Sequence, residues 1–233
     1  MGAVPQEPMR GPRLEEEAGW GFVSPGESRI PAALAVVAAL LLYVVLPNRL
    51  TLGPTWLLPS LEIALLIPLA LANPSRLSRE SRNLRALSIA LIALVSLANV
   101  TSLSLLVHYL LRGGKAGGRA LIYSAIGIWI TNVLVFALWY WELDRGGPLA
   151  RTQPHHRRPD LLFPQMATPW VVDGPWVPRF IDYLFTSLTN ATAFSPTDTM
   201  PLTPVAKVLF GAQSLISVMV VVIVGARAVN ILS

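Results

Sequence analysis

The sequence has no cysteine and few charged residues. None of its 233 residues is Cys, and Asp, Glu, Lys and Arg together make up only 13%, about half the share found in a soluble domain. The absence of Cys excludes disulfides, thiolate metal sites and a Cys nucleophile. With 53% hydrophobic residues, the shortage of charge predicts an all-α integral membrane protein in the cell (plasma or inner) membrane that crosses it several times.

Recognisable catalytic and metal motifs are also missing. There is no nucleophile elbow, phosphate loop or zinc motif, and His155 and His156 lack a third convergent ligand. We therefore expect no enzyme, cofactor or metal site. The net charge of +5 does not predict a nucleic-acid partner, because no basic helix or aromatic platform accompanies it; in a membrane protein basic residues more often mark loops at the lipid headgroups.

Five apolar runs predict about five transmembrane helices, with the lipid bilayer as surroundings. We expect a disordered polar tail over residues 1–29, a four-helix membrane region over 30–142, an extramembrane cap over 143–177 and a C-terminal unit over 178–233. Pro31 suits a first helical turn and Pro47 closes that helix. The runs cover residues 31–46, 56–71, 84–111, 120–141 and 208–226.

A short amphipathic helix precedes the last apolar run. Residues 178–193 would span only about 20 Å at 1.5 Å per residue, which is too short to cross a bilayer. Asp182, Thr186, Thr189 and Asn190 share one face of this helix at spacings typical of a helix. Two interpretations fit this pattern equally well: a re-entrant segment that enters and leaves on one side, or an interfacial helix lying flat beside an ordinary last span.

The region 185–207 resembles the pore module of tetrameric potassium-channel-type cation channels, of the voltage-gated-like superfamily. In that family a pore helix ends in Thr-Thr-Val-Gly-Tyr-Gly-Asp, and a Ser-Pro-x-Thr-Pro run starts the inner helix. Here Thr199-Met200-Pro201-Leu202-Thr203-Pro204 occupies the place of that run. Thr203 followed by Pro204 is also typical of a helix N-cap with proline at the first helical position. The place of the filter is taken by Thr192, Ala193, Phe194, Ser195, Pro196, Thr197 and Asp198.

The resemblance implies a homotetramer that conducts inorganic ions passively through a filter without Gly-Tyr-Gly. Pro196 fixes its own φ and restricts Ser195, so a ladder of inward carbonyls selective for potassium is not expected. On this hypothesis Asp198 attracts cations, and Gln213 and Ser217 line the conduit. The strings WYWELDRGGP, FPQM and AFSPTDTMPLT also resemble a family of uncharacterised bacterial membrane proteins, which implies no activity.

Two charged residues lie inside apolar runs. A charge at a helix centre costs about 2.5–3.5 kcal/mol, so Glu62 marks either a pathway or a buried, protonated or hydrogen-bonded group. Arg227 is its candidate partner, although it could equally snorkel toward the interface. Stripes of small and polar residues within 88–108 and 124–132 predict helix–helix contacts.

Other charges leave orientation and chemistry open. Arginines flank both ends of the third run, so the positive-inside rule satisfies only one loop. The pore resemblance would place the N-terminus and the 142–177 connection outside. Glu142 and Asp144 could act as acid and base, but pairing with Arg145 or Arg151 at the headgroups is favoured.

The sequence thus predicts an ion-channel-like protein. The alternatives are a non-conducting structural or sensory membrane protein that keeps the same fold and, third, a secondary transporter. A transporter would normally show two related halves.

Overall fold

The structure, a computed structural model, describes residues 22–51, 56–71, 82–112, 118–153, 157–195 and 198–232. It is mostly helical, with one two-stranded sheet. The α-helices are α2 Ile30–Val45, α3 Leu57–Leu71, α4 Arg82–Leu111, α5 Gly118–Leu143, α6 Pro164–Ala167, α7 Phe180–Ala193 and α8 Pro204–Leu232. The described part also contains two strands, β1 Leu161–Leu162 and β2 Met200–Pro201. Its four 3-10 turns are Asn48–Leu50, Asp144–Gly146, Ala150–Thr152 and Pro169–Val171.

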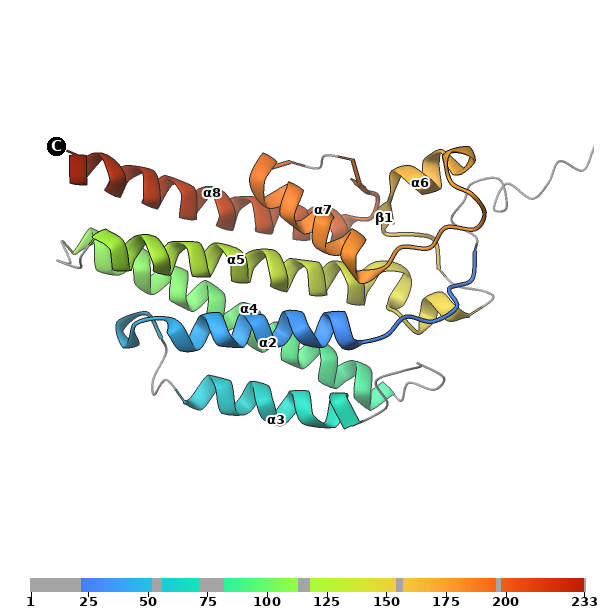
Figure 1. Ribbon diagram of the computed structural model, residues 1–233, viewed down its shortest axis with the longest axis horizontal. Helices are drawn as coiled ribbons and strands as arrows, with labels where there is room; N and C mark the ends of the chain where they lie inside the picture. The colour runs from blue at the N-terminus through green and yellow to red at the C-terminus, as the bar shows by residue number, and fades with distance from the viewer. Residues whose placement is uncertain are drawn as a thin grey trace, which may run out of the picture.

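Helix α5 lies at the centre of the bundle. It contacts α7 and α8 on one side and α2 and α4 on the other, while α3 packs outside α2 and α4 (Figure 1). Rings of Tyr140 on α5 and Phe210 on α8 have centroids 4.7 Å apart, within the range of favourable aromatic pairs. The α5 and α8 faces are therefore joined by an aromatic contact as well as by aliphatic packing.

Three helices are long and apolar enough to span a membrane: 83–111, 120–146 and 204–226. These lengths and compositions support the prediction of a membrane protein. Helices α2 and α3, with 16 and 15 residues, reach only about 24 and 22 Å at 1.5 Å per residue, short of a hydrocarbon core about 30 Å thick. Three of the five predicted spans thus have the length and apolarity to cross a membrane, and the number of crossings stays a prediction.

Proline and threonine set several helix ends as the sequence predicts. Pro31 lies in the first turn of α2, and the chain becomes extended at Leu46, just before Pro47. Thr203 caps α8, because its Oγ1 accepts the Ala206 N–H at 3.3 Å, with Pro204 in the first turn. These local expectations are confirmed.

The last residues of the predicted tail make hydrogen bonds to the rest of the chain. Glu27 accepts hydrogen bonds from Trp141 Nε1 at 2.8 Å and from the Phe180 backbone N–H at 2.6 Å, and the Ser24 N–H donates to the Arg151 carbonyl at 2.9 Å. Residues 22–29 therefore join the cap formed by the 143–179 connection. These hydrogen bonds link the polar residues before α2 to the cap and to the start of α7. Residues 1–21 lie outside the described part.

Candidate functional site

Helix α7 and the start of α8 form a hairpin at the cap end of the bundle. In Figure 1, α7 begins beside the cap and runs about half the length of the bundle before the chain returns to the same end. Phe194 ends α7 in a left-handed conformation (φ 57°). On the way back β2 pairs with β1, and α8 then starts beside the cap. Entry and exit of the hairpin thus lie at one end.

Helix α7 packs polar residues against the protein and exposes apolar residues on its opposite face. Thr186 and Asn190, from the predicted polar face, are buried against the protein. Ile181, Phe185 and Leu188 are 64, 54 and 40% exposed. A helix lying flat at the membrane surface keeps its polar face in water and its apolar face in lipid. Here the polar face is occupied by protein, which disfavours the interfacial interpretation.

A buried network of amide and hydroxyl groups holds α7 to α5 and α8. Gln213 lies at its centre: Oε1 accepts from Tyr140 Oη at 2.6 Å and from Asn190 Nδ2 at 2.8 Å. Gln213 Nε2 donates to the Ser187 Oγ at 2.6 Å and to the Ser187 carbonyl at 2.9 Å. All functional atoms of the Gln213 amide are therefore paired inside the protomer.

Helix α5 extends the same network toward the far end of the bundle. Asn132 Nδ2 donates to Ser217 Oγ at 3.0 Å, and Ser187 Oγ donates to the Val133 carbonyl at 2.7 Å. Gln213 and Ser217 are both 0% exposed, whereas a residue lining a conduit between subunits must be exposed on its own subunit. We therefore leave both out of any conduit. The polar stripe on 124–132 makes the predicted helix–helix contact at Asn132.

The described residues of the filter-like turn lie at the surface of the molecule. Thr192, Ala193, Phe194 and Ser195 are exposed, as is Asp198, while Pro196 and Thr197 lie outside the described residues. Thr192 Oγ1 donates to the carbonyls of Leu188 and Thr189, at 3.0 Å each. The Thr192 hydroxyl is thus used within α7, but its side chain remains open to the surroundings.

A cavity of about 100 Å³, lined by both apolar and polar side chains, lies between this turn and the cap. Asp182 and Asp198 both line it, and Thr186 and Thr199, whose hydroxyl oxygens are 3.0 Å apart, form part of its wall. Gln165 Oε1 is buried in the same wall and has no hydrogen-bond partner among the described residues. Carboxylate, amide and hydroxyl oxygens are donors that suit a hard cation; this cavity is called the vestibule below.

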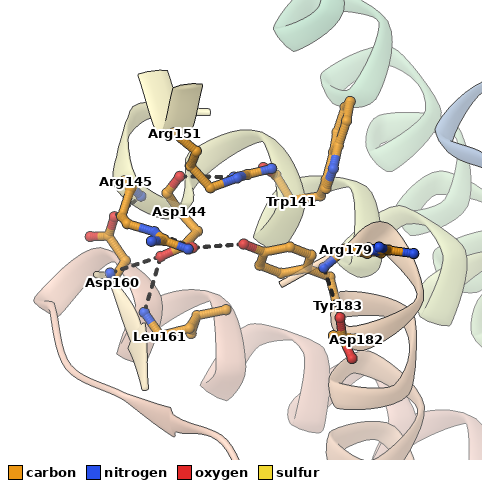
Figure 2. A network of polar contacts seen from close by, with 9 residues as sticks. All are labelled: Trp141, Asp144, Arg145, Arg151, Asp160, Leu161, Arg179, Asp182 and Tyr183. Carbon is orange, nitrogen blue, oxygen red and sulfur yellow. Dashed lines mark hydrogen bonds and ion pairs between the residues drawn. The ribbon is translucent and has the colours of Figure 1, made fainter. Parts of the chain in front are cut away.

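Behind α7, a buried cluster of charges fixes the cap (Figure 2). Asp144, 1% exposed, accepts from Tyr183 Oη at 2.7 Å and from the backbone N–H groups of Asp160 and Leu161 at 2.9 and 3.3 Å. Its Oδ2 lies 3.3 Å from Arg145 Nε. One carboxylate thereby joins the end of α5, strand β1 and helix α7.

Arg151 and Tyr183 close this cluster. Arg151 Nη1 donates to the carbonyls of Trp141 and Asp144 at 2.8 and 3.0 Å, and its guanidinium carbon lies 5.2 Å from the centroid of the Tyr183 ring, within cation–π range. Burial raises the pKa of the Tyr183 phenol well above its usual value. Tyr183 therefore remains a hydrogen-bond donor to Asp144 at ordinary pH.

The favoured ion pairing of the WELDRGG string is confirmed for Asp144, which pairs with Arg145. Glu142 instead lies 4.0 Å from Arg85 on α4. Both acids are buried, and so is Arg145, whereas the Arg85 side chain is 39% exposed. Gly147 enables the turn: its φ is 101°, and a Cβ would lie 2.9 Å from the Glu142 carbonyl oxygen, closer than real Cβ atoms come.

The two charges predicted inside the membrane lie away from the hairpin. Glu62 is on α3 and is 1% exposed, among side chains from α2, α4 and α5. The side chain of Arg227 lies outside the described part, as do the basic residues His155 and His156. The proposed Glu62–Arg227 pair is therefore not addressed by the structure.

Sequence reasoning missed Ser187, Tyr183 and Gln165. Helical spacing could have revealed Ser187, which is one turn before Ala191 and three residues before Asn190 on the inward face. For Tyr183 and Gln165 the sequence offers no such signal, because their partners come from the irregular cap.

No protein-family model, no curated protein and no solved structure matches the chain.

Proposed function

We propose that the protein is an ion-channel-like membrane protein in which the α7–turn–α8 hairpin is a re-entrant pore module. One observation carries the proposal: α7 is too short to cross a bilayer, its polar face points into the protein and its apolar face points outward. Such a helix is stable at membrane depth, where its polar groups are satisfied by protein and its exposed side chains by lipid. The return of the chain to the cap end supports the same interpretation.

The ion is a cation. Asp198 is exposed beside the turn and shares the vestibule with Asp182. Several copies of Asp198 around an axis would form an anionic ring, which selects cations in channel mouths. The filter-like residues Thr192 to Asp198 form the narrow part on this proposal.

The walls of the conduit come from the assembly of several protomers, which number four on the pore-module hypothesis. One hairpin encloses no conduit by itself. In its most apolar stretch α8 is only 22% buried, against 67% for α5, so most of α8 remains available for contact with lipid or with another copy. Exposed Val208 and Leu215, seven residues apart, mark the face that would pack around the axis.

The test is conduction by the purified protein in planar bilayers, with the mass of the detergent-solubilised complex measured beside it. The wild type should show cation-selective currents and a mass of four chains. Asp198→Asn should lower the cation conductance several-fold. Asp173→Asn, which removes an exposed carboxylate of the cap connection outside the vestibule, should leave it unchanged. A monomer without currents would contradict the proposal.

A second candidate is a non-conducting structural membrane protein. It is favoured by the complete pairing of Gln213 and by the burial of Ser217, which leave α8 no polar stripe toward an axis. A tetramer that carries no current under any ion gradient would select this candidate.

A further inference from the structure

The buried acid Glu62 lies in a cavity that the pore hypothesis does not use. Helices α2, α3, α4 and α5 enclose a space of about 10 Å³, roughly one water-sized sphere. Its polar lining consists of Glu62, Tyr43, Asn99, Ser102 and Thr131, and apolar side chains complete the wall. The cavity is at a four-helix junction and is separate from the vestibule beside α7.

The buried oxygens of Glu62 and Ser102 indicate that this cavity binds a polar ligand. Both side chains are 1% exposed, and neither Glu62 Oε2 nor Ser102 Oγ has a hydrogen-bond partner among the described residues. Burying a hydroxyl or a carboxylate without a partner costs several kcal/mol, roughly 2–7 for a neutral polar group. Native proteins seldom retain two such groups in one cavity unless water or an ion satisfies both.

The charge around the cavity favours a monovalent cation. Among its lining residues Glu62 is the one carboxylate and Tyr43 the one other titratable group; none of them is a Lys, Arg or His. A single buried carboxylate needs one positive charge or a proton to be neutral. A divalent ion would leave a net charge of +1 in an apolar bundle, which is unfavourable for the same reason.

The ligand chemistry and the volume narrow the choice further. Carboxylate, amide carbonyl and hydroxyl oxygens are hard donors, which bind hard cations of the alkali and alkaline-earth series. A space of about one water-sized sphere suits Na⁺ better than the larger K⁺. We propose that the α2–α5 bundle holds a buried Na⁺ site centred on Glu62 and Ser102, with Asn99 and Thr131 as further oxygen donors.

The bound Na⁺ would have a structural role, because it would connect α3 to the rest of the bundle. Helix α3 packs mainly on α4 and α2, and Glu62 is its buried acid among the described side chains. Na⁺ shared by Glu62 on α3, Ser102 on α4 and Thr131 on α5 would join three helices at one point. This role is independent of conduction through the α7 hairpin.

The test measures thermal unfolding of the full chain in detergent while NaCl replaces choline chloride at constant ionic strength. The wild-type midpoint should rise with NaCl concentration, and KCl should have a much weaker effect, because only bound ligand shifts the folding equilibrium. Ser102→Ala should raise the NaCl concentration for half the effect several-fold. Ser104→Ala, an exposed serine two residues along α4, should not change it.

A chemical measurement reports on Glu62 itself. Dicyclohexylcarbodiimide modifies protonated carboxyl groups in apolar surroundings, and bound Na⁺ should slow its reaction at Glu62 several-fold, whereas choline should not. Glu62→Gln should abolish both the labelling and the Na⁺-dependent rise of the midpoint. A wild-type midpoint that is equal in NaCl and choline chloride, or labelling that Na⁺ leaves unchanged, would show that a proton or water fills the cavity and would overturn the proposal.

Discussion

Tyr183 illustrates, at the scale of one residue, how a side chain of α7 contributes to holding the cap. Its hydroxyl donates to Asp144 at 2.7 Å, and its ring lies under the Arg151 guanidinium. Nothing in the sequence pairs Tyr183 with Asp144, which is 39 residues earlier. The sequence predicted that Asp144 would pair with a neighbouring arginine, because Arg145 is adjacent; it could not predict a partner that the fold brings from α7.

Replacing Tyr183 by Phe should lower the free energy of unfolding by about 1–3 kcal/mol, since a buried acceptor loses its donor. Tyr123→Phe is the matched control, because Tyr123 is 72% exposed; it should change stability by less than about 0.5 kcal/mol. Chemical denaturation in detergent micelles measures both. Equal effects of the two substitutions would contradict the role given to Tyr183.

The stability difference between the wild type and Tyr183→Phe should depend on pH in one direction. The Tyr183 pKa is raised in the folded state, so its contribution is complete below pH 10 and is lost as pH rises toward the folded pKa. In that range the unfolded phenol releases a proton that the folded one keeps, and wild-type stability falls. Tyr183→Phe lacks this dependence, so the gap between the two should narrow above pH 10.

At the scale of elements, α7 combines what sequence could and could not predict. Its length, its polar face and its start near residue 180 follow from periodicity, and the Thr203 cap predicts where α8 begins. The direction of the polar face could not be predicted, because a polar stripe fits water and a protein interior equally well. The polar face of α7 points inward because Asn190 hydrogen-bonds Gln213, a contact that exists only once α7 and α8 are packed together.

The network around Gln213 should be the main polar contribution to the α7–α8 contact. Gln213→Leu keeps the volume but leaves Tyr140, Asn190 and Ser187 without an amide partner, which should cost about 1–3 kcal/mol of unfolding free energy. Leu215→Ala, two residues along α8 and 63% exposed, should cost less than about 0.5 kcal/mol. Denaturation of both variants in the same detergent provides the comparison.

At the scale of the whole molecule, the cap end and the opposite end carry different parts of the basic charge. Arg85 and the cap lie at the end where α7 and α8 begin, and Arg112 lies at the other end of α4 (Figure 1). Composition predicted a membrane protein, and three helices are long enough to span. Apolar runs alone do not fix the number of crossings, because α2, which ends just before Pro47, and α3 have only 16 and 15 residues, fewer than the roughly 20 that cross a hydrocarbon core.

The depth of α7 in the bilayer tests the central claim most directly. The cysteine-free chain allows single spin labels at Ile181→Cys, Phe185→Cys and Leu188→Cys, all on the exposed face of α7. If α7 enters the bilayer from the cap end, the measured depth should increase along the three positions, by up to about 10 Å at 1.5 Å per residue. Three labels at one shallow depth would mean that α7 lies flat at the surface, and the re-entrant pore module would be wrong.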